Sequence, residues 1–271
     1  MGETDKIVFE LLEDRYHRYN VLSYIDEDPI QVPHLFTQKE DIEVAAFLSA
    51  SIAWGQRKTI VKNARELMKL MDYQPYEFIR SAGRNDLELF DRFVHRTFNG
   101  TDCRFFIESL QHIYQQHGGL EEVFVKGYRR DETIFTALAY FREVFLSSGH
   151  EPRSEKHLSS VMAGSAAKRL NMMLRWLVRR DSIGVDFGIW NQIPMSALMI
   201  PLDVHVGMVS RMLGLLTRRQ HDWKAVVEIT EKLRVFDPND PGKYDFSLFG
   251  MGVNGEGRKA FPTPPQLTPD L

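Results

Sequence analysis

The chain has 271 residues, of which 43% are apolar, so it can bury a substantial core as one large domain or two lobes. The net charge of −3 gives no overall basic field, and the single cysteine, Cys103, excludes an intrachain disulfide and any all-cysteine metal or iron–sulfur site. The N-terminus does not read as a signal peptide, and no segment reaches the roughly 18 apolar residues of a membrane helix. We therefore expect a cytoplasmic protein that does not bind membranes.

Apolar residues recur at helical spacing along most of the chain, and no stretch alternates as a half-buried strand does. In chain order, the spacing predicts helices over 5–20, two within 41–71, then 75–80, 87–95, 102–117, 120–125 and 131–146. Loops are expected at 26–38 and 147–155, with a turn at 98–100. Further helices are expected after the turn at 164–166, from residue 203, over 223–235 and over 245–251. The predicted fold class is all-α.

The stretch from Val161 to Leu215 carries the candidate chemistry. Ser165 is the expected N-cap of a helix whose first turn contains Lys168, and Asp203 is the expected N-cap of a second helix. A cation is disfavoured at a helix N-terminus unless it meets an anion or loses its proton, and a neutral lysine amine is a nucleophile. A nearby carboxylate can accept that proton or stabilise a developing cation. The alternative is that Lys168 is a solvated helix residue and Asp203 only a cap.

Basic residues are concentrated between Arg153 and Asp181, where seven lysines and arginines face only two acids. Arg169 and Arg175 are candidate contacts to DNA phosphates, as is Arg57 near the first core helix. Arg179 and Arg180 fit a solvated helix face at least as well. No His-x-x-x-His or Cys-x-x-Cys pair is present, so no protein-bound metal is expected.

The segment VMAGSAAKRLNMML, from Val161, resembles the hairpin of the helix-hairpin-helix DNA glycosylases, which reads LPGVGRKTANVVL in relatives of endonuclease III. IPLDVHVGMVSRMLGL, from Ile200, resembles that family's VDTHV segment and its closing LGL triplet. VAAFLSASIAWGQ, from Val44, resembles its first core helix, LIAVLLSAQAT. The resemblance covers roughly residues 41–252, and the layout also resembles a bacterial branch of the superfamily.

Several positions depart from the family pattern. The hairpin's proline and second glycine are Ala163 and Ala166, and the glutamine that wedges into the duplex is Ser51. The family's C-terminal cysteine cluster is missing. The catalytic positions, Lys168 and Asp203, lie 35 residues apart, farther than in endonuclease III. That spacing, with DPNDPGKYDFSLFGMGV from Asp237, looks more like the archaeal branch that removes 8-oxoguanine.

The resemblance implies a base-excision repair glycosylase with AP-lyase activity on double-stranded DNA carrying a damaged base, such as an oxidised purine. The damaged nucleotide would be flipped into a pocket, where Lys168 forms a Schiff base with assistance from Asp203. The hairpin, Gly164 to Ala166, would offer amides to a phosphate. No cofactor is implied, although hairpin carbonyls hold a monovalent cation in relatives.

Side chains for a base pocket are expected after the first core helix. Trp54 could stack on a flipped base and Gln56 could read its edge, with Ser51 at the wedge position. A core tryptophan beside a surface turn is an equal alternative. His205 could orient Asp203 or contact phosphate, although a lone histidine at a helix start is more often structural.

The resemblance implies a two-lobed helix-hairpin-helix fold. We expect residues 1–40 to pack on the core, 41–150 and 151–253 to form the lobes, and 254–271 to be an irregular, proline-rich tail. A monomer is expected, and whether 181–200 is a lid or packing stays open. The alternatives to an enzyme are a non-catalytic DNA-binding protein that retains the fold and a helical interaction protein.

Overall fold

The computed structural model describes residues 2–256, and these are mainly helical. The first helices and the one strand pair are α1 (Glu3–Tyr19), α2 (Tyr24–Glu27), α3 (Lys39–Ser51), α4 (Arg57–Leu70), α5 (Pro75–Ser81), α6 (Arg84–Leu87), β1 (Val94–His95), β2 (Phe98–Asn99) and α7 (Gly100–Gln116). The later helices are α8 (Leu120–Tyr128), α9 (Ile134–Phe145), α10 (Lys168–Val178), α11 (Val204–Met212), α12 (Trp223–Phe236) and α13 (Tyr244–Val253). The all-α prediction is confirmed at this level.

The helix expected over 87–95 is wrong. The chain there forms the end of α6, a short 3-10 helix (Glu88–Phe90) and the antiparallel pair β1–β2. Arg96 at the turn has a φ of 57°, a left-handed conformation that ends any helix. The predicted loops at 26–38 and 147–155 also contain helical turns, namely α2 and the 3-10 helices Pro29–Gln31, Pro33–Leu35 and Pro152–His157.

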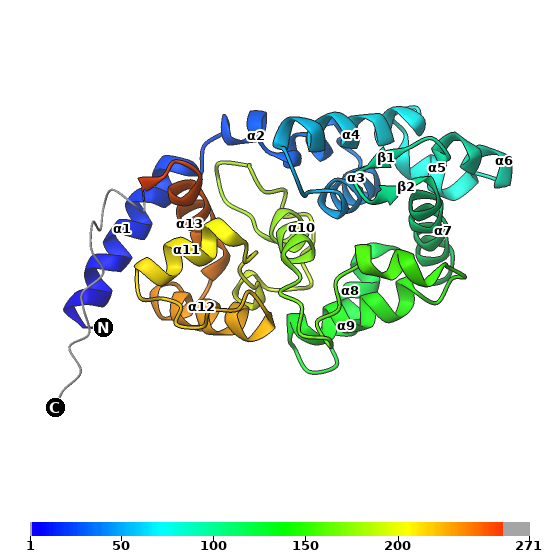
Figure 1. Cartoon of the computed structure of the whole chain (residues 1–271). Coiled ribbons are helices and arrows are strands. Elements are labelled where there is room, and N and C mark those ends of the chain that lie inside the picture. Colours follow the sequence, from blue (N-terminus) through cyan, green and yellow to red (C-terminus); the bar gives the residue numbers. More distant parts are fainter. Residues whose placement is uncertain (1, 257–271) are drawn as a thin grey trace.

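Helix α10 runs through the middle of the molecule (Figure 1). Helices α3 to α9 lie on one side of it, and α1, α11, α12 and α13 lie on the other. Helix α1 packs against α13 although they are opposite ends of the described chain. One continuous apolar core runs through both groups, with α10 against α3. The irregular tail expected from residue 254 lies outside the described residues apart from 254–256, where Glu256 pairs with Arg15 (Oε2 to Nε, 2.6 Å).

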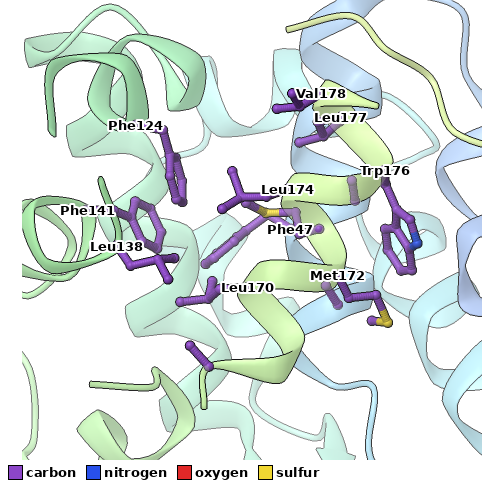
Figure 2. Packing of buried hydrophobic residues seen from close by; sticks show 14 of the residues in the cluster. Phe47, Phe124, Leu138, Phe141, Leu170, Met172, Leu174, Trp176, Leu177 and Val178 are labelled. Atoms are coloured by element: carbon purple, nitrogen blue, oxygen red, sulfur yellow. The ribbon is translucent and has the colours of Figure 1, made fainter. Parts of the chain in front are cut away.

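The predicted apolar stripe of α10 is part of a helix that is buried on nearly every side. Leu170 and Leu174 point toward α8 and α9, while Met172 and Trp176 point the other way (Figure 2). A helix covered all round has no solvated face to hold its polar residues. The arginines of α10 must therefore find partners inside the protein.

The connection between α10 and α11 is packed against the core. Phe187 and Trp190 donate their backbone amides to the carbonyls of Trp176 and Leu177 on α10 (2.7 and 2.8 Å). The buried indole of Trp190 donates from Nε1 to Oε1 of Glu43 on α3 (2.7 Å). These contacts hold the segment against the end of α10. Residues 185–190 are therefore packed on the core and do not form a free lid.

Candidate functional site

A cavity of about 630 Å³ opens where the first turns of α10 and α11 meet α13. The segment that follows α3, the start of α4 and the short helix α2 complete its walls. Its acidic, basic and histidine lining residues come from distant parts of the sequence: Asp28, Arg57, Lys168, Arg169, Arg175, Asp203, His205, His221 and Asp245. The volume falls within the range of small-molecule sites.

Lys168 is the first residue of α10 and its half-buried side chain lines this cavity. The residue before it, Ala167, is in the left-handed region with a φ of 46°, which costs energy for a residue that has a side chain. The Lys168 amine donates to the thioether sulfur of Met172 (3.5 Å). The strained residue therefore turns the chain into α10 with the lysine at the cavity wall.

Asp203 is the N-cap of α11, as its place before the helix predicts. Its Oδ1 accepts from the backbone amides of His205 and Val206, both at 2.9 Å. The same carboxylate lines the cavity, so the structure brings Lys168 and Asp203 to one site. His205 also lines it, but it bonds Asp203 through its backbone amide, and its ring lies edge-on to Phe249.

The hairpin 161–167 differs from the expectation at its cap. Ser165 does not cap α10, because the helix begins only at Lys168 with Ala167 as its N-cap. Ser165 instead forms an isolated bridge with Asp222, and the backbone amide of Trp223 donates to the carbonyl of Gly164 (2.9 Å). Ala166 is buried, and its backbone does not adopt the left-handed conformation that would favour a glycine there.

The carbonyls around the hairpin already accept hydrogen bonds. The carbonyl of Val161 accepts from the amide of Gly164 (2.9 Å), and that of Ala166 accepts from the side chain of Asn171 (3.1 Å). The Gly164 carbonyl is taken by Trp223. A carbonyl oxygen has two lone pairs, so one hydrogen bond to each does not exclude a monovalent cation, and the cation stays a prediction.

Arg169 points inward rather than toward solvent. Its guanidinium donates to the backbone carbonyls of Ser51 and His157 and lies over the Trp54 ring, 4.7 Å from its centre. Burial lowers the pKa of Arg169 to about 10. Trp54 lines the cavity as predicted, but Arg169 and the stacked His157 ring already lie against it. The phosphate contact expected of Arg169 does not agree with this position.

The DNA-phosphate contact expected of Arg175 is wrong, because the residue is buried. It is 1% exposed, and its guanidinium pairs with Asp186 (Nε to Oδ1, 3.2 Å) and with Asp245. Arg179 is equally buried and pairs with Asp186 and Asp240 (3.1 and 2.9 Å). Burial alone would lower the pKa of Arg179, but these carboxylates raise it above its ordinary value.

The basic run from Arg153 to Asp181 therefore forms no continuous basic surface. Arg153 pairs with the buried Asp102 (2.9 Å), leaving Lys156 and Arg180 as its exposed cations within the described chain. Charge density along the sequence gave the wrong expectation, because Arg169 turns inward and Arg175 and Arg179 are buried in and directly after α10.

The remaining predicted residues separate into two groups. Arg57 lines the cavity, within 3.3 Å of the Glu27 carboxylate and over the Phe249 ring. Ser51 is buried in α3 and Gln56 is exposed just before α4, so neither belongs to the cavity lining that the described residues form. The base-reading and wedge positions inferred for Gln56 and Ser51 do not agree with this placement.

Asp245 is a cavity residue whose position the sequence did not reveal. Lys243 holds the N-cap position of the last helix, and Asp245 is buried in the first turn of α13. Burial raises the pKa of Asp245 to about 6, with Arg175 opposing the shift and the charge of Asp203 adding to it. Lys168 lies close enough to lower it. Three ionisable groups from α10, α11 and α13 thus act on one another.

His221 is the second residue that sequence reasoning missed. It lies in the loop before α12, lines the cavity and accepts at Nε2 from Arg211 (3.0 Å). Nothing in its neighbours in sequence distinguishes it from the other eight histidines. His221 reaches the cavity only because the loop between α11 and α12 folds back against α11.

Within residues 2–256, no group of three or more His, Cys, Asp or Glu side chains is arranged to hold a metal ion. No described helix combines the length and apolar character needed to cross a membrane.

Comparison with known proteins identifies a family but not an activity. Neither the curated proteins nor the solved structures include a significant match. A family model described as "Protein of unknown function (DUF2400)" matches residues 28–254, which is most of the chain. The protein therefore belongs to this family of unknown function.

Proposed function

We propose that the protein is a DNA glycosylase with AP-lyase activity, with its active site in the cavity shared by Lys168 and Asp203. The observation that carries the proposal is that these two residues, 35 positions apart, line one cavity at the first turns of two helices. The resemblance of both segments to the catalytic segments of helix-hairpin-helix glycosylases gives the reaction class. Oxidised purines such as 8-oxoguanine are the proposed substrates.

Lys168 is the proposed nucleophile. Its neutral amine attacks C1′ of the flipped nucleotide, a C–N bond forms, and the bond from C1′ to the base breaks with the electron pair leaving on the base. Opening of the sugar ring then gives a Schiff base between Lys168 and C1′. Loss of a proton from C2′ and cleavage of the C3′–O bond break the strand by β-elimination. The contact of the amine with the Met172 sulfur supports this role, because Met172 also lines the cavity and the contact keeps the amine at its wall.

Asp203 is the proposed acid–base partner. Its Oδ1 is fixed by two backbone amides, which orients the carboxylate at the cavity wall. A carboxylate there can accept the proton that the lysine loses and stabilise positive charge on the sugar. The cavity volume and the aromatic ring of Phe249 in its lining support a site for a nucleobase.

Covalent trapping tests the proposal. The protein is incubated with duplexes that carry 8-oxoguanine, an abasic site or no damage, and borohydride is added to reduce any Schiff base. We expect an adduct on the damaged duplexes that Lys168→Gln abolishes. Asp203→Asn should slow trapping by roughly 10²-fold or more while keeping the fold, because asparagine caps helices as well as aspartate.

The matched control is Lys156→Gln, which removes an exposed lysine from the same region. It should trap as the unmodified protein does. An adduct that persists in Lys168→Gln would refute the assigned nucleophile. If no duplex gives an adduct while DNA is still bound, the non-catalytic DNA-binding protein replaces the enzyme. If no duplex is bound at any salt concentration, the helical interaction protein replaces both.

A further inference from the structure

The loop between α11 and α12 is held in place by one arginine. Arg211 donates from Nε to the carbonyl of Arg218 and from Nη2 to that of Arg219, each at 2.9 Å. Its third donor, Nη1, bonds Nε2 of His221 at 3.0 Å. A guanidinium has a fixed fork of donors, so the three bonds together fix the path of this loop.

These contacts decide the protonation of His221. A guanidinium only donates, so the Nε2 that faces Arg211 must be an acceptor, and the proton of the neutral ring is on Nδ1. A second proton on Nε2 would break the bond and place two cations together. Burial and the charge of Arg211 lower the pKa of His221, with Asp203 opposing them. His221 is therefore a neutral donor at Nδ1 near neutral pH.

The fold places this donor at the mouth of the cavity. His221 lines the cavity together with Asp203, yet the residue as a whole is exposed. The next residue, Asp222, bridges Ser165 of the hairpin, so the loop runs beside it. Gly207 of α11 makes room for the His221 ring, since a Cβ there would collide with His221 and Arg211.

We propose that His221 donates a hydrogen bond from Nδ1 to a phosphodiester oxygen of a DNA strand whose nucleotide enters the cavity. Arg211 is then a positioning residue that acts through His221. A phosphodiester fits because the Nδ1–H group of His221 only donates and the residue lies at the entrance of the cavity. The choice of ligand rests on the proposed function, whereas the protonation of His221 does not.

Equilibrium binding tests the contact. The full chain is titrated against a labelled duplex with a tetrahydrofuran abasic analogue, which cannot form a Schiff base, at several KCl concentrations. His221→Ala should weaken binding about tenfold, because a hydrogen bond to a charged group is lost. The slope of log Kd against log salt should not change, because a neutral donor releases no counterion. A protonated histidine would change it by about 0.9.

Two substitutions separate the ring nitrogens. His221→Asn places an amide donor where Nδ1 lies and should restore affinity to within about threefold, whereas His221→Gln places its amide near Nε2 and should not. His17→Ala, an exposed histidine of α1, should bind as the unmodified protein does. Nitrogen NMR of the imidazole should give the Nδ1–H form, and Arg211→Gln should raise the pKa of His221.

The outcomes are distinguishable from failure of the proposed function. Unchanged affinity in His221→Ala, a salt slope that changes by about one, or an Nε2–H ring would overturn this inference alone, even where covalent trapping succeeds. Binding that weakens as expected without any trapped adduct would support the contact and count against the glycosylase. Failure of the unmodified protein to bind the duplex would overturn both.

Discussion

Arg175 of α10 and Asp245 of α13 form a buried ion pair beside the cavity that Lys168 lines. Their side chains are 2% and 7% exposed, and Asp186 from the α10–α11 connection completes the partners of Arg175. The pair thus links the helix that carries the proposed nucleophile to the last helix and to the segment between the two motifs. Its electrostatics affect both stability and the site.

Removing Arg175 should destabilise the protein strongly. Arg175→Met would leave Asp245 buried without its cationic partner, and breaking a buried pair in this way costs about 3–5 kcal/mol of unfolding free energy. Denaturant unfolding measures the loss. Arg180→Met removes an exposed arginine near the same helix end and should change stability by less than about 0.5 kcal/mol. Equal effects of the two substitutions would refute the structural role of the pair.

Asp245 should make stability fall as pH rises from about 4 to about 6. Its folded pKa of about 6 lies above the ordinary value near 3.9, so in this window the folded protein binds more protons than the unfolded chain. The slope from this group is at most about 1.4 kcal/mol per pH unit, and it levels off above pH 6. Subtracting the unfolding free energy of Asp245→Asn from that of the unmodified protein at each pH isolates the contribution of Asp245. If the two proteins show the same dependence of unfolding free energy on pH, the raised pKa of Asp245 is contradicted.

The charged neighbours of Asp245 predict in which direction substitutions should change its pKa. Asp203→Asn removes a negative charge and should lower the pKa of Asp245, whereas Lys168→Gln removes a positive charge and should raise it. Carbon NMR of the carboxyl group measures both shifts. A pKa that responds to neither substitution would mean that the three side chains do not share the site.

Packing of the first helix on the last should be sensitive to one methyl group. A Cβ at Gly250 of α13 would enter the ring of Tyr19 on α1. Overpacking costs typically about 1–3 kcal/mol, which exceeds the roughly 1 kcal/mol that alanine gains over glycine in a helix. Thermal unfolding should therefore give a lower Tm for Gly250→Ala. Gly149→Ala, where a Cβ meets no atom within 4 Å, is the matched control and should change little.

The connection between α10 and α11 should resist hydrogen exchange. The amides of Phe187 and Trp190 bond to α10 carbonyls, so they should exchange with protection similar to that of α10 itself. Glu43→Ala removes the acceptor of the Trp190 indole and should speed exchange in this segment, together with loss of the Glu43 contacts to Tyr114 and Lys39. Exchange at the rate of an unstructured peptide in the unmodified protein would contradict the packed arrangement.

Local patterns were enough to predict most helices, because an apolar stripe at helical spacing is a property of neighbouring residues. They failed at 87–95, where the left-handed Arg96 and the pairing of β1 with β2 override helical spacing. They also failed for Ser165, since the hairpin bridges Asp222 and the helix begins three residues later than its expected cap.

The sequence by itself determined the helical class and singled out Lys168 and Asp203, because spacing, capping chemistry and motif order are written along the chain. Tertiary structure alone decided which charges are buried and which side chains meet them. Arg175 and Arg179 count as a basic surface in the sequence, but α10 is enclosed, and their partners Asp186, Asp240 and Asp245 come from other segments. His221 likewise reaches the cavity only through the fold of its loop over α11, since electrostatic partners are set by distance in space rather than along the chain.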